Sequence, residues 1–174
     1  MKRATLIACL FALPAPAFAQ APSATGGPVT SQAERDAIAA RVRAGASCAG
    51  CDLFQIDLAY QAIPGRDFRG ARIRQADLTI ATADRANFRG ANLSLTNFFG
   101  ARLTGADLRD ANLEGAMLVG TYFGGARFDG AVLDGANLSG AELQTARGLT
   151  QAQLNTACGA PTTRLPDGLT IPNC

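Results

Sequence analysis

The sequence predicts an all-β fold in which the chain winds into a four-sided β-helical solenoid, with a short helix covering each end. Three observations predict it: a five-residue period across residues 51–145, a recurrence of similar segments every 20 residues, and a helix-capping motif on each side of the repeats. The 174 residues include 19 Gly but only 6% aromatic residues, which favours a thin, closely stacked structure over an ordinary globular core.

The five-residue period continues without insertion through 19 units, from CDLFQ at 51–55 to AELQT at 141–145. The third position is Leu, Ile or Phe in 18 units, with Ala83 as the exception, while the first is Ala in 13 units and the fifth is Gly in 11. Five residues turn a helix about 140° past one full turn, and a straight strand alternates every two residues, so neither forms one apolar face with this period. The chain must therefore bend once per unit, at the fifth position, with positions one and three facing inward.

The number of sides follows from a longer recurrence. DFRGAR at 67–72, NFRGAN at 87–92 and DLRDAN at 107–112 are spaced by 20 residues, which is four units. Each coil is therefore predicted to be a square of four units, and successive coils to stack at the strand spacing of about 4.8 Å. In this register Ala83 lies inside the coil, between Ile63 and Leu103.

The repeats over residues 51–145, of the form A(D/N)LxG, resemble those of the pentapeptide-repeat family. The resemblance implies a right-handed quadrilateral β-helix and says little about activity. One branch of that family protects or inhibits DNA gyrase by mimicking duplex DNA with a strongly acidic surface, so a gyrase or nucleic-acid competitor is one alternative function. The repeats here carry nine Arg against eleven Asp and Glu, a balance that disfavours this alternative and any nucleic-acid partner.

The first 19 residues are predicted to form a signal peptide, because a basic start, an apolar run and a small-residue cleavage site, AFA at 17–19, follow one another. The apolar run is too short to cross a membrane, so no span is expected once the leader is removed. LIAC at 6–9 resembles a lipobox and leaves a lipoprotein as an alternative. We expect an exported protein, periplasmic or secreted, that begins at Gln20 with a flexible linker over residues 20–30.

Both ends of the repeat region are expected to be caps. Residues 31–50 comprise a helix opened by a capping box, SQAE, and then a turn that contains two cysteines. Residues 146–174 comprise a short helix to about Ala157, opened by a second capping box, TQAQ, and a tail pinned by a disulfide. Such caps cover the backbone that a stack of coils exposes at its ends. The residues of the first helix available for burial are Ala37, Ile38, Val42 and Ala44.

Four cysteines remain after the leader: Cys48, Cys51, Cys158 and Cys174. The two ends of the coil lie about 20 Å apart, beyond the limit of about 7 Å between Cα atoms, which leaves the local pairings 48–51 and 158–174. An exported protein meets an oxidising compartment, which favours both disulfides. The C-x-x-C at 48–51 leaves a thiol–disulfide redox protein and free thiols as alternatives, but no βαβ pattern surrounds the motif.

The sequence contains no His. This excludes Ser-His and Cys-His nucleophile pairs and removes the commonest general base and metal ligand. We therefore expect no enzymatic activity, no catalytic residue, no cofactor and no metal site.

Two outward columns of the predicted coil are candidate contact sites. Contiguous exposed apolar surface often marks a contact site, and one column with its neighbours is apolar: Tyr60, Ile80, Leu95, Phe99, Met117 and Val119. The other column, Arg69, Arg89 and Arg109, can bind an anion or an acidic partner, although adjacent Asp67 and Asp107 favour exposed ion pairs instead. We expect an exported, non-enzymatic scaffold that presents flat faces to an unknown protein partner or to itself.

Overall fold

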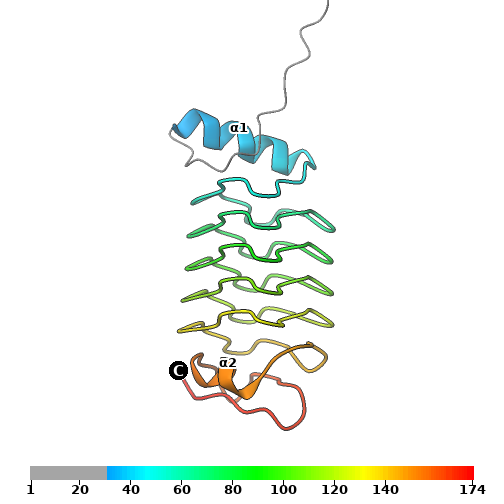
Figure 1. Ribbon diagram of the computed structural model, residues 1–174, viewed down its shortest axis with the longest axis vertical. Coiled ribbons are helices and arrows are strands. Elements are labelled where there is room, and N and C mark those ends of the chain that lie inside the picture. Colours follow the sequence, from blue (N-terminus) through cyan, green and yellow to red (C-terminus); the bar gives the residue numbers. More distant parts are fainter. Residues whose placement is uncertain (1–30) are drawn as a thin grey trace, which may run out of the picture.

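The computed structural model describes residues 31–174, so the predicted signal peptide and linker lie outside the described residues. Between helix α1 (Gln32–Arg43) and helix α2 (Gln151–Asn155) the chain winds as a stack of similar coils (Figure 1). We number these coils from the repeat: the first is 51–70, the second 71–90, the third 91–110, the fourth 111–130 and the fifth 131–150.

Successive coils are joined by parallel β-bridges at the second position of each unit. Residues 20 apart are paired without interruption, from Asp52 with Arg72 to Arg127 with Arg147. Four bridges per coil confirm the four-sided stacking register, while each side is too short to hold more than one bridge, so the described residues contain bridges and no longer strands. The right-handed winding implied by the family resemblance stays a prediction.

The chain bends at the fifth position of each unit, as predicted. Every fifth-position residue from Gln55 to Gly140 has a φ angle near +60°. Glycine adopts this conformation without strain, whereas other residues are disfavoured there and β-branched ones most of all. Seven of these corners nonetheless carry another residue, among them Ile80 with a φ of 55°.

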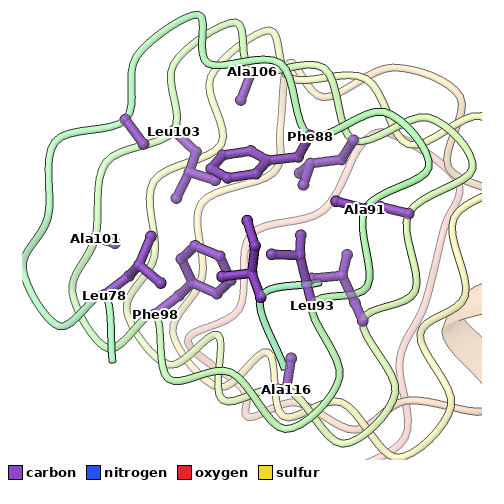
Figure 2. Packing of buried hydrophobic residues seen from close by; sticks show 14 of the residues in the cluster. Leu78, Phe88, Ala91, Leu93, Phe98, Ala101, Leu103, Ala106 and Ala116 are labelled. Atoms are coloured by element: carbon purple, nitrogen blue, oxygen red, sulfur yellow. The ribbon is translucent and has the colours of Figure 1, made fainter. Parts of the chain in front are cut away.

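The inside of the coil is filled by the first and third positions. Third-position side chains are buried throughout the repeats, and alanine at the first position lets the walls approach them (Figure 2). The rings of Phe68 and Phe88 stack with centroids 5.3 Å apart. Ala83 is fully buried, and its N–H donates to the carbonyl of Arg102 in the coil below, which confirms its predicted place between Ile63 and Leu103.

The repeat begins one unit earlier than the predicted boundary at residue 51. Cys48 N–H donates to the Asp67 carbonyl and Gly50 N–H to that of Arg69, both at 2.8 Å, so residues 46–50 stack on the first coil as a further unit. Cys48 takes the buried third position in place of Leu or Phe, and Gly50 forms the corner with a φ of 67°. The N-terminal cap proper is therefore α1 and its following turn.

Helix α1 lies across the first end of the stack (Figure 1) and begins at the predicted capping box. It buries Ala39 and Val42, with Ile38 packed beside them. Ala37 and Ala44, which were expected to be available for burial, are exposed. At about 100° per residue Ala37 lies opposite Ala39 on the helix, and Ala44 is the C-cap residue beyond the last turn.

The C-terminal cap prolongs the coil while changing its register. Helix α2 begins at the predicted capping box and ends at Asn155, two residues before the predicted end. Because α2 replaces an extended side, the bridge spacing grows from 20 residues to 21 between Asn137 and Cys158, and to 22 between Glu142 and Arg164. The tail then returns beneath this last coil, where Gly159 forms a bridge with Asn173.

Candidate partner-contact surface

The predicted apolar column forms one side of the stack. Its units, 56–60, 76–80, 96–100 and 116–120, lie above one another through parallel bridges. We call their outward residues, with the adjoining corner residue Leu95, the apolar face. Its large side chains are exposed: Tyr60 72%, Ile80 50%, Phe99 48%, Met117 47% and Leu95 47%, with Val119 half-buried between them.

Three of these side chains project from strained corners. Tyr60, Ile80 and Leu95 all have φ angles between 55° and 61°. Glycine in the next coil makes room for Leu95, because a Cβ added at Gly115 would lie 2.8 Å from a Leu95 methyl. A Cβ added at Gly100 would lie in ordinary contact with Ile80 Cγ1, at 3.5 Å. Strained backbone that persists is a reason to look for function at that position.

The polar groups among the apolar side chains are satisfied within the chain. The Thr79 hydroxyl donates to Asp77 at 2.5 Å and accepts from the Asn97 amide at 2.8 Å. Asp77 and Asn97 also accept the backbone N–H groups of Thr79 and Phe99. What this face still offers to another molecule is therefore mainly apolar surface.

Tyr122 is a further exposed aromatic residue that the sequence analysis missed. It is 42% exposed and lies on the neighbouring side of the fourth coil, at a second position. Its ring folds over Gly124, where an added Cβ would lie 2.7 Å from the hydroxyl oxygen. Its place could have been found from the two adjacent glycines, Gly124 and Gly125, because they leave space that such a ring can cover.

The predicted arginine column lies on another side, which we call the arginine face and define by units 66–70, 86–90, 106–110 and 126–130. The guanidinium of Arg69 binds Asp67 at 2.7 Å, and that of Arg109 binds Asp107 at 2.5 Å. Where the second position is Asn87 instead of Asp, Arg89 reaches the corner carboxylate of Asp110 at 3.3 Å. The residues of the predicted anion site are thus brought together, and each is paired with a carboxylate of the chain.

These ion pairs affect the titration of the carboxylates. The hydrogen bond from the Arg69 side chain holds the pKa of Asp67 below its usual value, and Arg109 does the same to the pKa of Asp107, in both cases against a smaller opposing effect of burial. The same contact raises the pKa of Arg109. Both members of each pair are therefore charged at neutral pH.

A cavity of about 180 Å³ lies between one side of α1 and residues 52–57 of the first coil. Its buried carboxylate, Asp52, accepts a hydrogen bond from Arg72 at 2.7 Å, and the Arg72 guanidinium also lies 4.8 Å from the centre of the Phe54 ring. The charged groups of Asp52 and Arg72 at this cavity therefore have partners within the chain.

The structure contains both local disulfides predicted from the sequence, Cys48–Cys51 at the start of the coil and Cys158–Cys174 in the C-terminal cap. Over residues 31–174, no three His, Cys, Asp or Glu side chains are grouped to hold a metal ion. Within the same range no helix is long and apolar enough to cross a membrane.

Comparison with protein families identifies the coil. Eight copies of the pentapeptide-repeat model match residues 67–108 and 106–144. The coil belongs to the pentapeptide-repeat family. No curated protein matches this pentapeptide-repeat chain.

Several solved structures are similar to the pentapeptide-repeat chain. A pentapeptide repeat protein from Nostoc Pcc 7120 is 25% identical, with 83% of this chain and 92% of that one covered and a TM-score of 0.47. Trypsin-treated QnrB1, a plasmid-mediated fluoroquinolone resistance protein, is 20% identical over 70% of this chain and 77% of its own, with a TM-score of 0.45. HetL from Nostoc sp. strain PCC 7120, involved in heterocyst differentiation regulation, is 26% identical over 66% and 62%, with a TM-score of 0.31.

Proposed function

We propose that this protein is an exported, non-enzymatic scaffold whose apolar face binds a protein partner or a second copy of the chain. The right-handed winding of its coil and its periplasmic or secreted location are part of this proposal. The observation that carries it is the contrast between the two outer faces. Large apolar side chains stay exposed on one, while Arg69, Arg89 and Arg109 on the other are paired within the chain.

The backbone of the apolar face supports a binding role. Leucine, tyrosine and above all isoleucine are poor choices for a corner with positive φ, where glycine has no such strain. A left-handed conformation costs such residues about 1–2 kcal/mol each. Keeping Tyr60, Ile80 and Leu95 there places apolar groups on both edges of one flat side. Such a surface fits contact with another protein better than it fits exposure to water.

The charge distribution disfavours the DNA-mimic alternative. A mimic of duplex DNA needs a continuous negative potential, whereas the nine arginines of the repeats balance nine of the eleven acids. The acids of the arginine face are also paired with neighbouring guanidinium groups.

Crosslinking in cells tests the proposal directly. A photo-reactive amino acid is placed at Phe99 on the apolar face and, as the matched control, at Arg89 on the arginine face, both of which are exposed. We expect a specific crosslinked product from position 99 and none from position 89. Equal products from both positions, or none from 99, would contradict a contact at the apolar face. N-terminal sequencing of the same material tests export, for which the expected first residue is Gln20.

A further inference from the structure

We propose that the occupant of the apolar face is a second copy of this chain, paired face to face and antiparallel. This inference rests on the proposed function, because it assigns a partner to the same surface. It follows from the distribution of large and small residues along the edges of the apolar face and from the position of its acids.

One edge of the face changes from large to small along the stack. The corner residues are Tyr60 and Ile80 in the first two coils, and Gly100 and Gly120 in the next two. Beside the fifth coil, the sulfur of Cys174 lies 3.4 Å from Asn137 Oδ1, so the C-terminal tail occupies the end of this side. The free surface therefore spans four coils, with two large corners followed by two glycine corners.

Consider a two-fold axis that lies in the plane of the interface, perpendicular to the stack, at the height between the second and third coils. This axis makes the edge complementary to itself. The first coil of one copy then faces the fourth of the other, and each position of the unit faces the same position. Tyr60 comes opposite Gly120, and Ile80 opposite Gly100. Each large corner thus meets a glycine corner; the space beside Gly120 is open, whereas Ile80 of the same chain already lies near Gly100.

The alternative two-fold arrangement, with parallel stacks, lacks this fit. It exchanges the two edges of the face at equal height, so that Tyr60 would face Gln55 and Ile80 would face Gln75. Large residues would then meet in the first two coils, although in the third coil Leu95 would face Gly100. Shape therefore selects the antiparallel pairing.

Charge favours the same pairing. The only acids of the apolar face are Asp57 and Asp77, in the first two coils. Antiparallel pairing sets them opposite the uncharged residues Met117 and Asn97. Parallel pairing would bring the acids of the two copies to the same height, where like charges repel.

The size of the apolar face sets the expected affinity of the dimer. Four coils at strand spacing are only about 15–20 Å tall. One flat side of this height buries less than the roughly 800 Å² per partner of a standard stable interface. We therefore expect a dimer that forms with rising concentration rather than a permanent one.

Sedimentation equilibrium of the mature chain measures the association. We expect the molar mass to rise from monomer to dimer as the concentration approaches about 100 μM. Phe99→Asp places a charge opposite Thr79 of the second copy and should weaken the dimer about tenfold or more. Val132→Asp is the matched control, because Val132 is 41% exposed but lies on another side of the coil, and it should leave the association unchanged.

Cysteine crosslinking tests the orientation. The antiparallel pairing sets Ala59 opposite Val119, so mixing Ala59→Cys chains with Val119→Cys chains should give a disulfide-linked dimer on mild oxidation. Neither variant should link to itself, because identical positions lie three coils, about 14 Å, apart along the stack. Self-linking of Ala59→Cys would overturn the antiparallel arrangement.

The outcomes separate this inference from the proposed function. A wild-type chain that stays monomeric up to about 100 μM overturns self-association. If the photo-reactive group at position 99 then captures a different protein, the proposed contact surface stands with another occupant. If it captures nothing, both proposals fail.

Discussion

The apolar face and the arginine face are made from the same five-residue unit, yet they differ at its exposed fourth position. On the arginine face, Arg69 and Arg109 lie beside carboxylates two residues earlier, and the ion pairs form within one unit. On the apolar face, Phe99 has no equivalent partner in the described chain and stays 48% exposed. The difference shows that a repeat can complete one face internally and leave another to be completed by a second molecule.

The largest expected effect concerns the core that both faces share. Leu103 is buried at a third position, so Leu103→Ala should lower the free energy of unfolding by about 2–5 kcal/mol. Denaturant unfolding measures this loss. Because the core supports every side of the coil, we expect association through the apolar face to weaken as well. A change below about 1 kcal/mol would contradict the stacking register on which both faces are defined.

The reverse change should strengthen the same core. Ala83 places a methyl group between the larger side chains of Ile63 and Leu103, so Ala83→Leu should fill unused space and stabilise the fold by about 0.5–2 kcal/mol. Thermal unfolding compares this variant with the wild type. A large loss of stability would show that neighbouring rings already fill this layer of the core.

The sequence predicts most of this core, and the reason is physical. A fixed bend every five residues leaves only one inward pattern, so the third positions, the four sides and the place of Ala83 follow from spacing alone. The unit at 46–50 was missed because Cys48 stands where Leu or Phe is usual. Once the structure is known, Gly50 is recognisable as its corner.

The surface was less predictable than the core. Register places Phe99 and Met117 on one side, but it does not say how far a side chain leans toward a neighbouring coil. The pairing of Arg89 with Asp110, 21 residues away, depends on such a lean, while the ring of Tyr122 turns over Gly124 within its own unit. These contacts arise from side-chain rotation, which a five-residue period does not encode.

A smaller effect separates strain from function on the apolar face. Ile80→Gly removes a β-branched residue from a corner with a φ of 55°, so the monomer should become more stable by about 0.5–1 kcal/mol. The same change removes apolar contact area, so association should weaken. Unfolding and sedimentation measured on one sample test both effects. A variant that loses stability would refute strain at this corner.

The smallest stability effect belongs to the arginine face. Asp107→Asn removes one partly buried surface ion pair, so it should cost about 0.2–1 kcal/mol at neutral pH. Because the folded pKa of Asp107 lies below the unfolded value, its contribution is complete above about pH 4 and disappears as the pH falls through the folded pKa. Unfolding at a series of pH values should therefore show wild type and variant converging in acid. A constant gap would contradict the ion pair.

The central claim, that the apolar face is left for a second molecule while the arginine face is complete, is tested most directly by Phe99→Ser. Both the free energy of unfolding and the molar mass at about 100 μM are measured, with Val132→Ser as the control for an exposed apolar residue elsewhere. We predict that Phe99→Ser leaves the chain mainly monomeric at this concentration and changes stability by no more than about 0.5 kcal/mol, while Val132→Ser changes neither. A Phe99→Ser chain that keeps the wild-type mass but unfolds more easily would show that Phe99 serves the fold itself, and would contradict the claim.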